Sequence, residues 1–130
     1  LNGSALIAVW TETPPSRKLV VEALHAAIPP GAPVLGPGRE WYAFVGRNPA
    51  IGMDGRSLPQ YGTTLTQSAK EFGAEYVVLI RDGSGAAPFY WVDERDPLVA
   101  RVAVSTGRPD DGVVLRSNVA GEEVVVTEVR

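Results

Sequence analysis

The sequence contains no cysteine and only one histidine, His25. The absence of cysteine excludes disulfide bonds, thiolate metal sites and cysteine nucleophiles. His25 is the only histidine, and neither a His-x-x-x-His nor an Asp/Glu-x-His pair is present, so we expect no metal and no other cofactor. We interpret His25 as a surface side chain near the end of a helix, where the helix dipole favours a positive charge.

The sequence also lacks long hydrophobic runs and an excess of positive charge. No run approaches the ~20 apolar residues that span a bilayer, and the start lacks the basic region followed by an apolar region that a signal peptide has. Lysine and arginine number 12 against 15 acidic residues, giving a net charge of −3. The basic residues are scattered along the chain, and this pattern argues against nucleic acid as a partner.

The composition is that of one ordinary globular domain, with 45% hydrophobic residues in a chain of 130. A chain of this length buries enough surface for one core. We assign residues 14–130 to a single domain and residues 1–13 to a linker or edge segment that is in part a candidate cloning remnant. Because the chain starts at Leu1 without an initiator methionine, we expect it to be a piece of a longer protein.

Helices are predicted from apolar spacing and from capping residues. The predicted helices cover residues 16–28, capped by Ser16, residues 65–72, with Thr64 as N-cap and Gly73 as C-cap, and residues 97–104, capped by Asp96. A shorter helical piece is predicted over residues 39–45. Strands are predicted where β-branched and aromatic residues cluster. The predicted strands cover residues 32–35, 48–53 and 75–80, and a hairpin joins residues 113–116 to residues 123–127. Alternating helices and strands predict an α/β fold, a Rossmann-like mixed sheet in two or three layers, mostly parallel, with a C-terminal antiparallel hairpin.

Gly36 and Gly38 flank Pro37 between a predicted strand and a predicted helix. In α/β proteins a glycine turn at this place holds phosphate through backbone N–H groups. Pro37, however, lacks an N–H group, and neither a third glycine nor a Gly-Lys-Ser/Thr sequence follows. A plain strand-to-helix turn is therefore the favoured interpretation, and a nucleotide or phosphate site is the alternative.

Arg39, Trp41 and Tyr42 form a second candidate site, together with Glu40. Aromatic faces suit contact with sugars and lipid head groups if they are exposed. The alternative is that the aromatic residues belong to the core, where they are usually found. The serines include no Gly-x-Ser-x-Gly sequence, and the charged residues 93–96 are interpreted as the loop that begins a helix, so no catalytic residue is predicted.

Several segments, taken in order, resemble one protein family. They are Ile-Pro-Pro-Gly-Ala-Pro-Val-Leu-Gly at residues 28–36, Glu-Trp-Tyr at 40–42, Gly-Arg at 46–47, Phe-Gly-Ala-Glu-Tyr-Val-Val-Leu at 72–79, and the hairpin strands. This order is similar to that of the extracytoplasmic C-terminal domain of bacterial polytopic glycosyltransferases of the dolichyl-phosphate-mannose protein mannosyltransferase family. The resemblance covers most of the chain.

The resemblance implies that catalysis belongs to the membrane part of a parent chain, which transfers sugar from a polyprenyl-phosphate donor. This chain would then be a non-catalytic accessory domain on the extracytoplasmic face of the membrane, monomeric in isolation. Its partners would be the membrane part and a lipid-linked sugar or acceptor, with Trp41, Tyr42 and Arg47 as matching candidate residues. The apolar residues 4–10 would approach from the last membrane helix. The alternatives are a free-standing domain that binds a nucleotide or phosphosugar at residues 36–38, and a purely structural interaction module.

Overall fold

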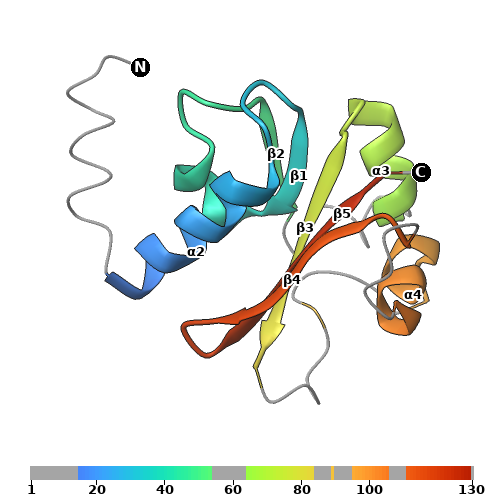
Figure 1. Cartoon of the computed structure of the whole chain (residues 1–130). Coiled ribbons are helices and arrows are strands. Elements are labelled where there is room, and N and C mark those ends of the chain that lie inside the picture. The colour runs from blue at the N-terminus through green and yellow to red at the C-terminus, as the bar shows by residue number, and fades with distance from the viewer. Residues whose placement is uncertain (1–14, 54–63, 84–88, 90–94, 106–110, 130) are drawn as a thin grey trace.

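A computed structural model describes residues 15–53, 64–83, 89, 95–105 and 111–129 of the chain. The expected segment over residues 1–13 lies outside the described residues. The elements follow in the order α2 (Pro15–Ala27), β1 (Val34–Pro37), the 3-10 helix η1 (Gly38–Ala43), β2 (Ala50–Met53), α3 (Leu65–Phe72), β3 (Tyr76–Asp82), α4 (Pro97–Val104), β4 (Val113–Val119) and β5 (Glu122–Glu128), as Figure 1 shows. This order confirms the α/β class.

The strands form one mixed sheet in the order β2-β1-β3-β5-β4. β1 is parallel to both β2 and β3, whereas β5 is antiparallel to β3 and to β4. The expectation of a mostly parallel sheet therefore holds only at the β2 end. The reason is the predicted hairpin, whose tight turn forces an antiparallel return and whose second strand inserts beside β3. Residues 124–127 of β5 are all buried, which suits this interior position.

The described elements form three layers, because helices cover both faces of the sheet (Figure 1). Successive side chains of a strand point to opposite faces. On one face Val78 and Ile80 of β3 pack in a cluster with Val20, Leu24 and other residues of α2. On the opposite face the alternate β3 residues, Val77 and Leu79, share a cluster with apolar residues of α3 and α4.

The segment around Gly36 differs from the predicted glycine turn. Gly36 and Pro37 belong to β1, which runs two residues further than predicted. A Cβ atom on Gly36 would lie 3.1 Å from the Cβ atom of Val78, so a side chain at this point would fit only if Val78 shifted by a few tenths of an ångström. The helical piece predicted for residues 39–45 is the 3-10 helix η1, which ends at Ala43.

The helix boundaries follow local capping chemistry. α2 begins at Pro15, one residue before the predicted cap Ser16, which therefore lies inside the first turn. Proline is favoured at a first helical position because its missing N–H group would have no partner there. At α3 the predicted cap is confirmed, since Thr64 Oγ1 accepts from Gln67 N at 3.0 Å. The predicted C-cap is confirmed as well, with Gly73 in the left-handed conformation.

Asp96 caps α4 as predicted, and it also binds α3. Its carboxylate accepts from the backbone N of Leu98 at 3.0 Å, from the backbone N of Thr66 at 3.2 Å and from the Thr66 hydroxyl at 2.6 Å. Asp96 is only 4% exposed, so the two helix N-termini share one buried carboxylate. Backbone N–H groups at helix N-termini are the favourable partners of such a negative charge.

Replacing Asp96 with alanine should therefore destabilise the domain more than removing an exposed cap does. We expect Asp96→Ala to lower the free energy of unfolding by about 3 kcal/mol, because one cap and one buried cross-helix contact are lost together. The matched control Thr64→Ala removes a single exposed cap and should cost about 1 kcal/mol. Urea denaturation followed by circular dichroism measures both. Equal losses would contradict the bridging role of Asp96.

Candidate functional site

The carboxyl ends of the parallel strands are the first place to look for a site. In open α/β sheets ligands bind outside these ends, at the point where connections leave a strand pair in opposite directions. β1 is followed by β2 on one side, while β3 lies on its other side. The corresponding position in this chain lies between the ends of β1 and β3, near Pro37 and Asp82.

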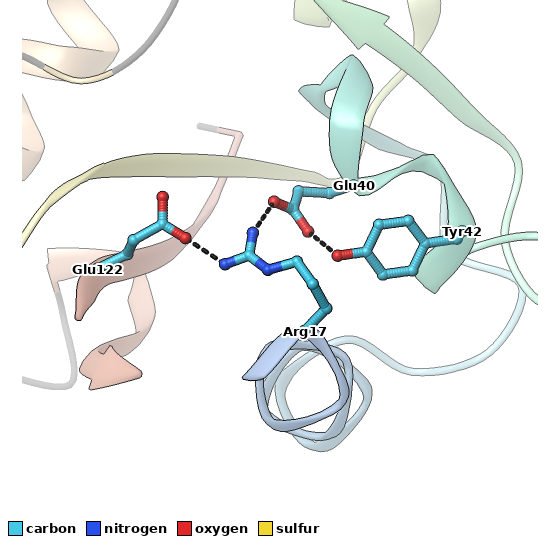
Figure 2. A network of polar contacts seen from close by, with 4 residues as sticks. All are labelled: Arg17, Glu40, Tyr42 and Glu122. Carbon is cyan, nitrogen blue, oxygen red and sulfur yellow. Dashed lines mark hydrogen bonds and ion pairs between the residues drawn. The ribbon is translucent and has the colours of Figure 1, made fainter. Parts of the chain in front are cut away.

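A network of four side chains occupies that position, as Figure 2 shows: Arg17 from α2, Glu40 and Tyr42 from η1, and Glu122 from β5. Arg17 donates to Glu40 Oε1 at 2.9 Å through one nitrogen and to Glu122 Oε1 through the other. The Tyr42 hydroxyl donates to Glu40 Oε2 at 2.8 Å. Glu122 is in register with Asp82, the last residue of β3, which places the network at the carboxyl edge of the sheet.

The network is arranged around a buried charge. Glu40 is 0% exposed, whereas the side chains of Arg17 and Glu122 are 20% and 14% exposed. A buried carboxylate is tolerated when it is paired and hydrogen-bonded, and both oxygens of Glu40 have a partner. Burial lowers the pKa of Arg17, but Glu40, Glu122 and Tyr42 raise that pKa more, so it lies above its ordinary value. The guanidinium therefore stays charged throughout the pH range in which proteins are studied.

The fold explains why Glu40 points inward. η1 follows β1 directly, and Ala43 and Phe44 at its end are buried in the cluster on the α2 face of the sheet. This packing holds η1 against the sheet and directs Glu40 towards α2, where Arg17 lies in the first turn. The contacts of Arg17 with Glu40 and Glu122 join residues 23 and 105 positions apart in the sequence.

Sequence reasoning missed Arg17 and Glu122 as members of this network. Neither residue stands in a motif, and no local spacing relates the two. Glu40 did carry a signal, because it lies in a short predicted helix directly before Trp41 and Tyr42, for which a place in the core was one of the two interpretations. A carboxylate in such a segment needs a cation, but the sequence alone does not single out Arg17 among the basic residues of the chain.

The predicted aromatic site is described only in part. Tyr42 is half-buried, its ring packs beside the core of the α2 face, and its hydroxyl binds Glu40 within the domain. The side chains of Arg39 and Trp41 lie outside what the structure describes. A role for Arg39, Trp41 and Tyr42 in contacting sugars or lipid head groups stays a prediction.

Arg47 lies away from the network, at the other end of α2. It donates to the backbone oxygen of His25 at 3.0 Å and to Asn48 Oδ1 at 2.9 Å. His25 is half-buried, with its Nε2 2.6 Å from the Ala43 carbonyl oxygen. His25 thus stands in the last turn of α2, as predicted, and its ring also contacts η1. Through these contacts His25 and Arg47 connect the end of α2 to the end of η1 and to the segment between η1 and β2.

The predicted glycine site corresponds to a small apolar hollow beside the β1–β2 pair. Gly36 and Gly52 stand opposite each other in the parallel register, and neither contributes a side chain. The lining residues are Gly36, Pro37, Phe44, Ala50, Ile51 and Gly52, none of them charged. Gly38 follows in η1, and nothing about its surroundings is described. A hollow of this chemistry suits a small apolar group rather than a phosphate.

Within the described part of the chain, no three histidine or acidic side chains gather as a metal site requires. None of the helices described there is long and apolar enough to cross a bilayer. Comparisons with the models of protein families, with curated proteins and with solved structures gave no match.

The burial of Glu40 predicts unequal effects for the two carboxylates bound to Arg17. We expect Glu40→Ala to lower the free energy of unfolding by about 3 kcal/mol, because it leaves a partly buried guanidinium short of a partner. Glu122→Ala should cost about 0.5 kcal/mol, with an effect that shrinks at high salt, because this pair is nearer the solvent. Urea denaturation at low and high salt tests both expectations, and a Glu40 effect no larger than the Glu122 effect would contradict them.

Proposed function

We propose that this chain is a non-catalytic accessory domain of a membrane glycosyltransferase similar to the dolichyl-phosphate-mannose protein mannosyltransferases. The membrane part of the parent chain transfers sugar from a polyprenyl-phosphate donor, and this domain contributes to acceptor or donor recognition. The ordered resemblance supports the proposal. Its two longest segments, residues 28–36 and 72–79, lie in the half of the domain that contains the parallel strands β1 and β3. For this half we propose a Rossmann-like arrangement.

The occupation of the carboxyl edge by the chain's own carboxylates is the observation that carries the proposal. Glu40 and Glu122 bind the guanidinium of Arg17 at this edge, and on the face of the sheet that α3 and α4 cover, Asp96 binds the N-termini of these two helices. In α/β proteins that bind small anions, helix N-termini and cations at this edge hold the ligand. In this chain the cation and the helix N-termini are bound by the domain's own carboxylates. This supports a domain that acts through its surface on larger partners.

The remaining parts of the proposal concern place and partners. The domain lies at the extracytoplasmic face of the membrane and contacts the membrane part of the same chain. In isolation it is a monomer. Arg39, Trp41 and Tyr42 are the proposed contacts to a lipid-linked sugar or an acceptor, because they belong to η1 beside the network and because aromatic faces suit sugars.

Deleting residues 14–130 from the parent enzyme should lower the rate of sugar transfer, through weaker binding of either the acceptor or the donor. The reason is that the domain supplies recognition and no reacting group. The measurement is the initial rate with a lipid-linked sugar donor in reconstituted vesicles, with donor binding measured in parallel. Unchanged transfer to every acceptor tested would contradict the proposal.

A free-standing domain that binds a small ligand is the second candidate, favoured by the hollow between Phe44 and the β1–β2 pair. The accessory-domain proposal predicts that nucleotides and phosphosugars leave the Tm of the isolated domain unchanged. A ligand that binds only the folded state raises the Tm. A rise in Tm that Gly38→Val abolishes would favour this second candidate instead.

A further inference from the structure

We propose that Arg81 and Arg116 form a binding site for a carboxylate group, on the face of the sheet that α3 and α4 cover. The site consists of the two guanidinium groups, Glu123 between them and the neighbouring Asn118. It lies on the opposite face of the sheet from Arg17 and its partners, and it is independent of the proposed function, because every contact that carries it lies within the domain.

The strand register brings the polar side chains of this site together. Arg81 of β3 and Asn118 of β4 stand opposite Glu123 of β5, one on each side of it. Arg116 lies two residues before Asn118 in β4 and therefore points to the same face. Val125, the next residue of β5 on this face, belongs to the cluster with α3 and α4. Figure 1 shows that the β4–β5 hairpin extends beyond α4, so the site lies between this helix and the hairpin turn.

The two guanidinium groups share a single carboxylate oxygen. Arg81 binds Glu123 Oε1 through Nε at 2.9 Å and through Nη2 at 2.8 Å, and Arg116 Nη2 lies 3.5 Å from the same oxygen. Within the described part of the chain, no other carboxylate contacts either guanidinium. Because arginine stays charged at any pH at which proteins are studied, one of the two positive charges is left unbalanced. A second carboxylate would neutralise it.

Both guanidinium groups are held in place and still have donors to offer. The guanidinium carbon of Arg81 lies 4.7 Å from the centre of the Phe89 ring, and Arg116 Nη1 donates to the Val102 oxygen at the end of α4 at 2.8 Å. Arg81 Nη1 and Arg116 Nε have no hydrogen-bond partner among the described residues, and neither atom is buried. Donors that are already fixed bind a ligand with a smaller loss of side-chain entropy.

The charge of the site favours a carboxylate over a phosphate. A guanidinium group matches the geometry of both anions through parallel N–H groups. One carboxylate balances the unpaired charge, whereas a phosphate monoester carries about −1.5 to −2 at pH 7 and would bring excess negative charge close to Glu123. The exposed amide of Asn118 offers a further donor without adding charge.

Nuclear magnetic resonance of arginine side chains tests the site directly. The chain is titrated with sodium acetate and, separately, with sodium chloride at the same ionic strength, which distinguishes binding from screening. We expect the Nε–H resonances of Arg81 and Arg116 to shift to saturation with acetate alone. Arg47 is the internal control, because it contacts the far end of α2. A response to acetate that equals the response to chloride would overturn the inference.

Two substitutions should change the affinity for acetate in opposite directions. Glu123→Gln keeps the shape of the side chain and removes a negative charge beside the ligand, so binding should become about threefold tighter. Arg116→Gln removes one guanidinium group and should weaken binding about tenfold. The matched control Lys70→Gln removes a positive charge from an exposed position of α3 and should leave the affinity unchanged.

Unchanged or weaker binding by Glu123→Gln would overturn the inference, and so would an Arg116→Gln variant that binds acetate as well as Lys70→Gln does. Circular dichroism checks that each variant is folded. If Arg116→Gln does not fold, the titration of the unchanged chain and the Glu123→Gln result decide.

The source of the carboxylate is tested with the blocked peptide acetyl-Gly-Glu-Gly-amide. Tighter binding of the peptide than of acetate assigns the site to an acidic side chain of a protein partner, and the reverse assigns it to a free organic acid. Either result supports a carboxylate site. Inorganic phosphate that binds more tightly than both would overturn the assignment to a carboxylate. None of these outcomes bears on the accessory-domain proposal, which depends on sugar transfer by the parent enzyme.

Discussion

The contact between Arg17 and the buried Glu40 is the interaction on which the arrangement at the carboxyl edge depends. It brings α2, η1 and β5 to one point, although the three elements are far apart in the sequence. Apolar packing also holds α2 against the sheet, but packing is non-directional and by itself leaves the rotation of a helix loosely determined. The paired charges have a defined geometry, because each carboxylate oxygen of Glu40 must meet its own donor.

The free-energy cost of burying the charge of Glu40 explains why the network is sensitive to the loss of any one partner. A carboxylate with no exposure is stable only while its cation and its hydroxyl donor are in place, since an unpaired buried charge is strongly unfavourable. The network thus contributes less to the total stability than its short contacts suggest, and more to the choice of one packing over another. The network therefore also determines how η1 and the β4–β5 turn are placed relative to α2.

Local chemistry made much of the fold predictable from the sequence. The caps Thr64, Gly73 and Asp96 were identified because each acts on a backbone group within a few residues. The central strand β3 was identified from an unbroken apolar run, and the hairpin from two such runs around a turn. The extent of β1 was not predictable, because the close approach of Gly36 to Val78 exists only in the folded sheet. The candidate site was still harder to predict, because only the tertiary structure brings Arg17 and Glu122 together. The direction of β5 relative to β3 depended on the order of the strands in the sheet.

The shared carboxylate of Asp96 has a consequence for how the domain opens. Helix ends ordinarily fray one by one, each with its own small free energy. Here backbone N–H groups in the first turns of α3 and α4 donate to the same buried carboxylate, that of Asp96. If one helix end unfolds, the carboxylate that binds the other end becomes exposed. The two helices, separated in the sequence by β3, thereby form one cooperative unit on their face of the sheet, and amide exchange in both first turns follows a single opening event.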